Sequence, residues 1–314
     1  MNTLSPDALH AARQRIAEAV HHTPVMHSRA LDAAADARLF FKCENFQQTG
    51  AFKARGATNA VFSLSAEQAS RGVATHSSGN HGQALARAAA ARGIRATVVM
   101  PETAPRPKIE AVRGYGADII FCAPTNAARQ TTLDAFVADT RAEFIAPYDD
   151  VRVIAGQASC AAELIDDVPD LDAVIAPVGG GGLISGTALT ISALAPHIAV
   201  HGGEPSAADD AARSLESGQR CGNDAPQTIA DGLKASLGAI TWPIVRDHVT
   251  AITRVSEDEI VTAMRLIWQR MKIIVEPSCA VALAAVLAAP EHFANRRVGV
   301  ILTGGNVDLD RLPW

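Results

Sequence analysis

The sequence predicts an α/β protein built on parallel sheets, and the pattern of its apolar segments supports this class. Short apolar segments such as 73–76 and 173–178 alternate with longer segments of helical character. This alternation is typical of parallel sheets, whose strands are buried on both faces. The 314 residues suffice for one large domain or two smaller ones with proper cores.

The N-terminal part predicts a helix and then a strand. Residues 5–7 read Ser-Pro-Asp, which combines an N-cap, a proline at the first helical position and an early acid, so a helix should run to about Val20. Residues 38–44 should form an apolar strand. Gly50 supplies a turn, and another helix should begin near Phe52.

The next part predicts a small α/β domain at residues 70–145. Its expected strands are 73–76, 96–100 and 117–122, each followed by a helix, at 81–92, 107–113 and 126–141. Residues 143–146 are a candidate fourth strand. Because each strand is short and apolar, the sheet should be parallel.

A second α/β set follows. Its expected strands are 173–178, 198–203, 252–255 and 298–302. Its expected helices are one that follows the four glycines and ends at about Leu194, and others at 207–216, 256–271 and 277–288, with a loop at 221–227. The best-marked boundary is at Ser256, where Ser-Glu-Asp-Glu forms a capping box.

Composition is ordinary for a globular enzyme. Hydrophobic residues make up 48% and charged residues 19% of the chain, and the net charge is −5. No basic surface is therefore expected for nucleic acid. The longest apolar run, at 279–289, is too short to span a bilayer, so no membrane partner is expected.

The five cysteines are scattered and never form a C-x-x-C pair. An odd, dispersed set indicates reduced thiols, not a disulfide framework or a zinc site. The N-terminus also lacks the features of a signal peptide, so we expect a cytoplasmic protein.

Lys53 is the candidate catalytic residue. It follows an aromatic residue and is surrounded by small residues such as Gly50, Ala54 and Gly56, which would let a planar ligand approach closely. A desolvated lysine loses its proton readily and can form a Schiff base with an aldehyde, which suggests pyridoxal phosphate. Taken alone, a lysine is more often a solvated surface charge.

The segment 42–57 around Lys53 resembles the lysine motif of the fold-type II pyridoxal-phosphate enzymes, in the serine/threonine dehydratase and serine racemase branch. Five further segments match that branch in the same order: Ser-Ser-Gly-Asn-His-Gly (77–82), Gly-Gly-Gly-Gly-Leu (179–183), Glu-Pro-Ser (204–206), Glu-Pro-Ser (276–278) and Thr-Gly-Gly-Asn-Val-Asp (303–308). The likeness covers nearly the whole chain.

The resemblance implies an architecture similar to the tryptophan synthase β chain. A small parallel-sheet domain (70–145) would be inserted in a large pyridoxal-phosphate-binding domain made of 1–65 and 150–314. It also implies a homodimer, for which periodicity gives no signal.

Four glycines between a strand and a helix favour a phosphate-binding loop, because backbone N–H groups can approach the anion and the helix N-terminus adds positive potential. The alternative is a flexible turn. The resemblance assigns phosphate binding to Gly179, Gly180, Gly181 and Gly182. It also implies that Thr303 offers its hydroxyl to the pyridine nitrogen, that Asn80 bonds the 3′ oxygen and that Phe52 packs on the ring.

The segment 77–81 lies where a strand becomes a helix, so free N–H groups there can bind a substrate carboxylate. An ordinary N-cap is the alternative for its serines. The resemblance implies substrate contacts from Ser77, Ser78, His81 and Arg129, and places Ser78 opposite Lys53 across the cofactor. For His81 a structural role is favoured over that of an acid or base, and the alternative for Arg129 is a solvated helix residue.

Glu204, Ala208 and Asp210 repeat the spacing of the divalent-cation site in the racemase branch. Two carboxylates and one backbone carbonyl, completed by waters, suit Mg²⁺, with Ca²⁺ or Mn²⁺ as alternatives. Without the resemblance these would be two ordinary acids at a strand end and in a helix.

The resemblance implies a dehydratase that converts L-serine or L-threonine to a 2-oxo acid and ammonia. Lys53 would hold the cofactor as a Schiff base and remove the α-proton, and reprotonation by Ser78 would give serine racemisation. Ala235 and Cys279 depart from the usual pattern and leave substrate choice open. Alternatives are a threo-3-hydroxyaspartate dehydratase or a dedicated amino-acid racemase and, from another class, a non-catalytic ligand sensor.

Overall fold

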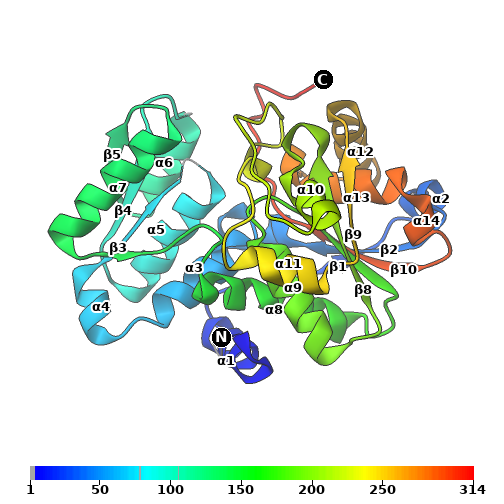
Figure 1. Ribbon diagram of the computed structural model, residues 1–314, viewed down its shortest axis with the longest axis horizontal. Helices are drawn as coiled ribbons and strands as arrows, with labels where there is room; N and C mark the ends of the chain where they lie inside the picture. The colour runs from blue at the N-terminus through cyan, green and yellow to red at the C-terminus, as the bar shows by residue number, and fades with distance from the viewer. Residues whose placement is uncertain (1–3, 78, 105) are drawn as a thin grey trace.

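The computed structural model describes residues 4–77, 79–104 and 106–314 and confirms the α/β class (Figure 1). A six-stranded sheet has the order β1-β2-β10-β7-β8-β9, and a four-stranded sheet has the order β5-β4-β3-β6. All pairs are parallel except β1 with β2. The strands are β1 (Val25–Met26), β2 (Arg38–Cys43), β3 (Val73–His76), β4 (Ala96–Pro101), β5 (Asp118–Cys122), β6 (Glu143–Phe144), β7 (Ala173–Pro177), β8 (Ala199–Pro205), β9 (Ala251–Val255) and β10 (Arg297–Leu302).

Helices cover both sheets. They are α1 (Pro6–Ile16), α2 (Arg29–Ala35), α3 (Lys53–Phe62), α4 (Ala66–Arg71), α5 (Asn80–Arg92), α6 (Arg106–Gly114), α7 (Asn126–Thr140), α8 (Val151–Asp167), α9 (Gly182–Leu194), α10 (Asp210–Ser217), α11 (Thr241–His248), α12 (Glu257–Met271), α13 (Pro277–Ala288) and α14 (Pro290–Phe293). Helix α3 packs on both α5 and α8, so it joins the two parts of the molecule (Figure 1).

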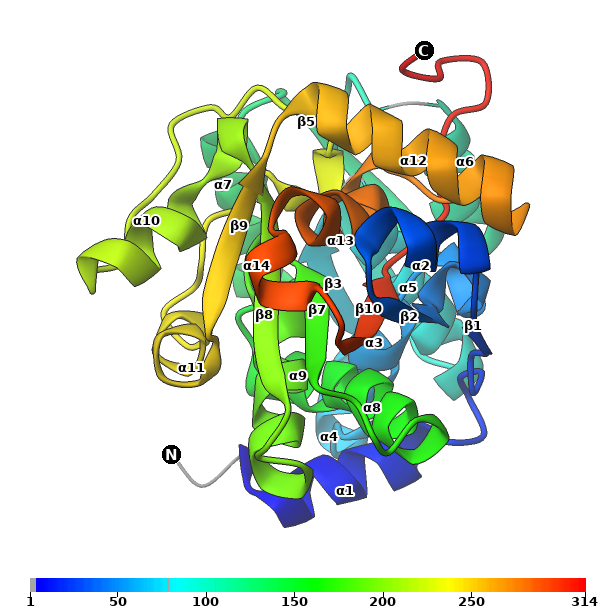
Figure 2. The same cartoon turned by 90° about the vertical axis from the view of Figure 1, so that its right-hand side faces the viewer.

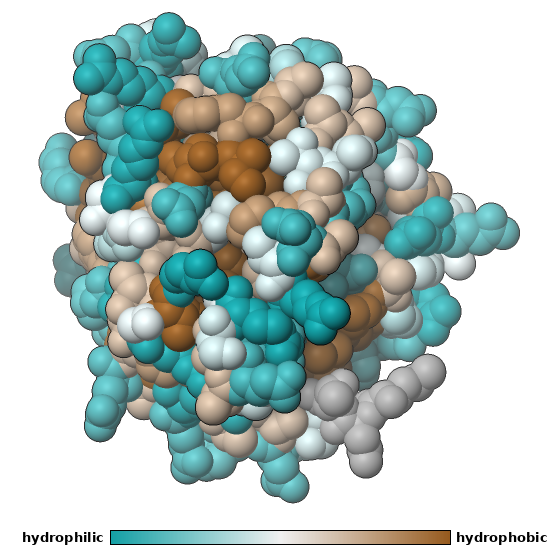
Figure 3. Space-filling model, turned by 90° about the vertical axis from the view of Figure 1, so that its left-hand side faces the viewer, coloured by the Kyte–Doolittle hydropathy of each residue, from teal (hydrophilic) through white to brown (hydrophobic). Residues whose placement is uncertain are grey.

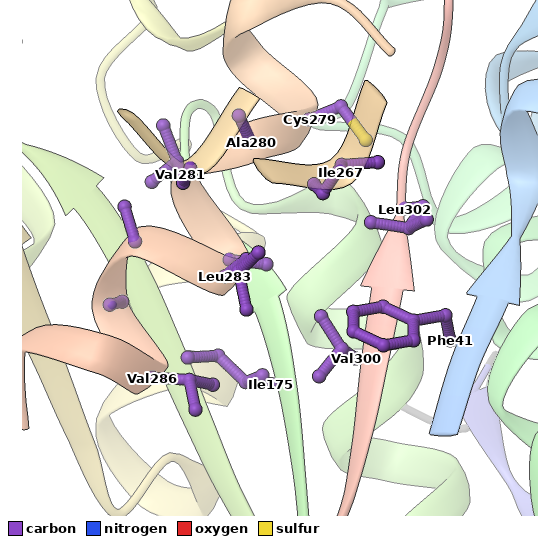
Figure 4. Packing of buried hydrophobic residues seen from close by; sticks show 14 of the residues in the cluster. Phe41, Ile175, Ile267, Cys279, Ala280, Val281, Leu283, Val286, Val300 and Leu302 are labelled. Atoms are coloured by element: carbon purple, nitrogen blue, oxygen red, sulfur yellow. The ribbon is translucent and has the colours of Figure 1, made fainter. Parts of the chain in front are cut away.

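The six-stranded sheet is buried on both faces (Figure 2). Phe41 and Val300 point to one face, where α2, α12 and α13 cover the sheet; Figure 4 shows them packed with Leu283 of α13. Phe40 and Ile301, one residue away along the same strands, join the cluster made with α8 and α9 on the other face. This alternation follows from the two-residue period of a strand and explains the continuous apolar runs.

The four-stranded sheet uses only residues 73–144, whereas the six-stranded sheet takes strands from both sides of that segment. The chain order therefore matches an inserted unit, although the exact domain limits stay a prediction. The outward surface of this smaller part mixes hydrophilic side chains with separate hydrophobic patches (Figure 3). Phe121, on the edge strand β5, is one of its exposed apolar residues.

Local signals located several boundaries correctly. The Ser256 hydroxyl accepts from the N–H of Glu259, whose carboxylate accepts in turn from the N–H of Ser256, so the predicted capping box is present. The first helix ends at Ile16 and not near Val20. There the N–H of Ala19 bonds to the carbonyl of Ile16, a tighter bond of the kind that ends helices.

Helix α8 was not predicted. Its first turn contains Val151, Val153 and Ile154, and Gly156 follows, all residues of modest or poor helix propensity. Asp150 caps the helix by accepting from the N–H of Arg152 at 2.8 Å. Tertiary packing against α3 and α9 outweighs the local preference.

Among the described residues, no helix is both long enough and apolar enough to cross a membrane.

Candidate active site

Segments distant in the sequence meet beyond the carboxyl ends of the central strands. The N–H of Phe52 bonds to the carbonyl of Thr303 at 3.0 Å, and Ala51 forms a β-bridge with Gly304. The start of α3, which carries Lys53, is therefore attached to the end of β10. This edge is where parallel sheets place their ligands.

The Lys53 amine is half-buried and donates a hydrogen bond to the carbonyl of Pro147 at 2.7 Å. Burial lowers the pKa of Lys53 to about 8, against the opposing effect of the negative charge of Glu276. The amine also lies 5.1 Å from the centroid of the Phe52 ring. A lysine with this pKa is partly neutral near physiological pH, as a nucleophile or base must be.

The glycine loop between β7 and α9 lies beside this lysine. A Cβ at Gly180 would overlap the ring of Tyr148, the residue that follows Pro147, and a Cβ at Gly179 would lie 2.9 Å from the Cα of Leu233. Gly181 has φ +87° and caps α9 without a side-chain hydrogen bond. The loop therefore requires glycine, and the N-terminus of α9 is available to an anion such as a phosphate.

The side chain of Thr303 is buried at the end of β10, and its hydroxyl lies near enough to the thiol of Cys279 to act on the pKa of that thiol. Burial raises the pKa of Cys279, so the thiol stays protonated at neutral pH. The carbonyl of Thr303 accepts from the N–H of Phe52, the residue before Lys53, which brings Thr303 close to the start of α3.

A polar network links α5 to this edge. Asn80 donates to the Oε1 of Glu276 at 2.9 Å, and Asn306 donates to the Oδ1 of Asn80 at 2.9 Å. Burial, and secondarily the charge of Asp231, raise the pKa of Glu276 to about 8. Sequence analysis matched the Glu276 motif without giving Glu276 a role, because only the folded chain brings it to Asn80.

The "Pyridoxal-phosphate dependent enzyme" family model matches residues 16–304. This chain belongs to that family. It is 55% identical over 304 residues to the β-hydroxyaspartate dehydratase of Paracoccus denitrificans (97% of this chain, 96% of the relative). It is 46% identical over 318 residues to the serine racemase of Dictyostelium discoideum (99% of this chain, 98% of the relative).

Solved structures of similar fold support the same family. Maize serine racemase matches with a TM-score of 0.95 and 44% identity, over 98% of this chain and 94% of that one. A threonine deaminase from T.th. matches with a TM-score of 0.93 and 42% identity, over 97% and 99% of the two chains. The predicted fold and cofactor class are therefore confirmed.

The segment expected to bind substrate in this pyridoxal-phosphate dependent enzyme lies between β3 and α5. The Ser77 hydroxyl accepts from the N–H of Gly79 at 3.2 Å, and Gly79, not a serine, is the N-cap of α5. Within the described residues no side chain caps α5, so its first N–H groups can face a ligand. Ser78 lies outside the described residues.

Two further predicted substrate residues, His81 and Arg129, lie in different surroundings. His81 is buried, its Nε2 lies 3.0 Å from the carbonyl of Ile145, and burial, with the nearby charge of Lys53, lowers its pKa to about 3. His81 is therefore neutral at physiological pH and cannot serve as a general acid there. The positive charge of Arg129 helps to lower the pKa of His76, so the two residues lie near each other. Because His76 is the last residue of β3, Arg129 lies near the carboxyl edge of the small sheet.

The candidate cation residues lie together after β8. The carboxylate of Glu204 accepts from the N–H groups of Ala211 (3.1 Å) and Ala212 (2.9 Å), and that of Asp210 accepts from the N–H of Leu237 at 2.9 Å. Burial raises the pKa of Glu204 to about 8 and that of Asp210 to about 6. Two neighbouring buried carboxylates fit a bound cation, whose charge would keep both ionised.

Ala208 is buried in the turn between these two acids. Within the described ranges no set of three or more His, Cys, Asp or Glu side chains could hold a metal, so a cation here would need further oxygen ligands, such as a backbone carbonyl and waters. The site roles of all these residues stay predictions.

Proposed function

We propose that this enzyme is a dehydratase that converts 3-hydroxyaspartate to oxaloacetate and ammonia. The observation that supports the reaction class is the half-buried, partly neutral amine of Lys53 beside the loop at Gly180. The substrate class is supported by the 55% identity to a β-hydroxyaspartate dehydratase.

The cofactor would be held from several sides. The N–H groups of the glycine loop and of the α9 N-terminus would bind its phosphate, the Thr303 hydroxyl would meet its pyridine nitrogen, and Asn80 would bond its 3′ oxygen. Phe52 would pack on its ring. When bound, pyridoxal phosphate supplies an electron sink for the charge that develops at the substrate α-carbon.

Lys53 would move the α-proton. Its amine can accept a proton because burial holds its pKa near neutrality, and the carbonyl of Pro147 fixes its position at 2.7 Å. Loss of the β-hydroxyl as water then gives an enamine, which is released, tautomerises to an imine and is hydrolysed by water to the 2-oxo acid and ammonia. A second proton donor on the opposite face, assigned to Ser78, would instead give racemisation.

Substrate carboxylates would bind at two places. The first N–H groups of α5, beside the Ser77 hydroxyl, would bind the α-carboxylate. Arg129, at the carboxyl edge of the small sheet, would approach a carboxylate when the two parts of the molecule close. His81 would contact substrate only in its neutral form.

A cation at Glu204, Ala208 and Asp210 would be structural. The carboxylate of Asp210 accepts from the backbone N–H of Leu237, and the side chain of Leu237 packs against Gly181 of the glycine loop, so the cation would support that loop. Mg²⁺ suits two carboxylates and a carbonyl, and Ca²⁺ or Mn²⁺ are alternatives. We also propose that the protein is a homodimer, as the family resemblance implies. A cytoplasmic location is supported by the free cysteines.

The test compares substrates on the cofactor-loaded enzyme with and without Mg²⁺. Threo-3-hydroxyaspartate, L-serine and L-threonine are supplied separately, and oxaloacetate, pyruvate, 2-oxobutyrate and D-serine are followed. We expect the highest kcat/KM for 3-hydroxyaspartate. Turnover of L-serine alone would reject the proposed substrate.

Serine is the second candidate substrate, favoured by the 46% identity to a serine racemase. D-serine formed from L-serine at a rate comparable to pyruvate would indicate a racemase. Pyruvate without D-serine would indicate a serine dehydratase. The absence of every product would favour a ligand sensor.

A further inference from the structure

A buried charge cluster lies behind the start of α3. The guanidinium of Arg55 bonds both carboxylate oxygens of Glu44 (2.7 and 2.8 Å) and both of Glu163 (2.6 and 2.7 Å). It also donates to the hydroxyl of Ser159 at 3.1 Å and to the carbonyl of His21 at 3.2 Å. Every nitrogen of the guanidinium therefore has an acceptor.

Lys42 completes the cluster. Its amine lies 2.8 Å from Glu163 and donates to the carbonyl of Thr23 at 2.7 Å, while the Thr23 hydroxyl donates to Glu44 at 2.5 Å. We call Arg55, Lys42, Glu44 and Glu163 the Arg55 cluster. All four are buried, and they come from α3, β2, the turn after β2 and α8. The cluster therefore ties α3 to the large sheet and to α8.

Lys53 and Arg55 are two positions apart in one helix, so their side chains leave it roughly 200° apart, on opposite faces. The amine of Lys53 reaches forward to Pro147, and the guanidinium of Arg55 reaches back to Glu44 and Glu163. The first turn of α3 is thus held from both sides.

We infer that Arg55 is a positioning residue: by anchoring the rear of α3 through two carboxylate forks, it fixes where the Lys53 amine lies at the cofactor. This inference rests on the proposed role of Lys53 as the cofactor-bearing lysine. Burying ion pairs costs desolvation free energy that apolar side chains would avoid, so such a cluster is weak evidence for stability alone. A fork to two carboxylates instead fixes orientation, which is what a reacting amine needs.

The test is Arg55→Lys, which keeps the charge but cannot span both carboxylates. Arg71→Lys is the control. Like Arg55, Arg71 donates to two carboxylates, Glu67 and Glu143, and to a backbone carbonyl, that of Arg141, but it lies beside the small sheet. Four properties are measured on each variant: cofactor bound per subunit, the fraction of that cofactor linked to Lys53 after borohydride reduction and peptide mass spectrometry, Tm, and the steady-state kinetics (kcat and KM).

We expect Arg55→Lys to retain bound cofactor, because the glycine loop lies between β7 and α9 and packs on Tyr148 and Leu233, outside the Arg55 cluster, while the linked fraction falls several-fold. The kcat should fall on the order of 10–100-fold with little change in KM, as for a displaced reacting group. Arg71→Lys should keep the linked fraction of the wild type. An unchanged linked fraction in Arg55→Lys, or its loss only in proportion to bound cofactor, would overturn the inference.

If Arg55→Lys does not fold, Glu163→Gln replaces it, because glutamine keeps one oxygen for Arg55 and removes the charge that completes the fork. We expect a smaller loss of the linked fraction, and no loss would refute the positioning role. Failure of the proposed function can be told apart from failure of this inference. If the wild-type enzyme carries no cofactor linked to Lys53, the role of Lys53 as the cofactor-bearing lysine is rejected. If the cofactor is linked but the wild type is inactive, only 3-hydroxyaspartate as the substrate is rejected.

Discussion

The amine of Lys53 and the carbonyl of Pro147 lie 2.7 Å apart although 94 positions separate them in the chain. The next residue, Tyr148, fills the space above Gly180, so one short segment contacts both the lysine and the glycine loop. The segment 147–148 therefore connects Lys53 to the glycine loop, the two parts of the proposed cofactor site.

Replacing Lys53 should abolish the reaction. Lys53→Ala removes the amine that is bonded to Pro147, so both turnover and covalent cofactor attachment should fall below detection. Lys272→Asn is a suitable control, because Lys272 is exposed in the left-handed region, which asparagine tolerates. Turnover of 3-hydroxyaspartate by Lys53→Ala would contradict the proposed chemistry.

Adding a methyl group to the glycine loop should weaken cofactor binding. In Gly180→Ala the new Cβ would overlap the Tyr148 ring and displace the loop, and we expect the cofactor Kd to rise at least about tenfold. A Cβ at Gly114 meets nothing, so Gly114→Ala should leave Kd unchanged. Fluorescence titration with pyridoxal phosphate measures both, and partial recovery in Gly180→Ala combined with Tyr148→Ala would identify the ring as the cause.

Cation binding should stabilise the folded enzyme. Mg²⁺ that binds between Glu204 and Asp210 must raise Tm with concentration, because it binds the folded state alone. Asp210→Asn should lose that rise, whereas Glu216→Gln, an exposed site on the same helix, should keep it. Equal rises in all three proteins would show that the cation binds elsewhere.

His201 should make the enzyme less stable in acid. It is buried against His292 and Phe293, and burial lowers its pKa to about 4, from about 6.5 in an unfolded chain. Between these values the unfolded state binds more protons, so the free energy of unfolding falls as pH falls, by up to about 1.4 kcal/mol per pH unit.

His201→Phe removes this titration, so its free energy of unfolding should depend less on pH between 6.5 and 4 than that of the wild type. Urea unfolding at several pH values in that window measures the difference. Parallel curves for the two proteins would mean that His201 does not titrate as its burial implies.

Sequence alone predicted the local chemistry of the enzyme. Lys53 among small residues and the glycines at 179–182 are marked by their immediate neighbours, because turns and helix starts depend on a few adjacent residues. The role of Thr303 came from the family resemblance and not from its neighbours. The alternation of short apolar strands with helices likewise predicted the parallel sheets.

Only the tertiary structure decided which distant groups complete the site. Pro147 and Tyr148 have no local signal, and the motif at Glu276 predicted no role for that residue, because these roles depend on segments that packing brings together. Arg55 reads as one more helical arginine until the fold buries it between Glu44 and Glu163. A buried charge takes its function from the partners around it, and those partners come from other parts of the chain.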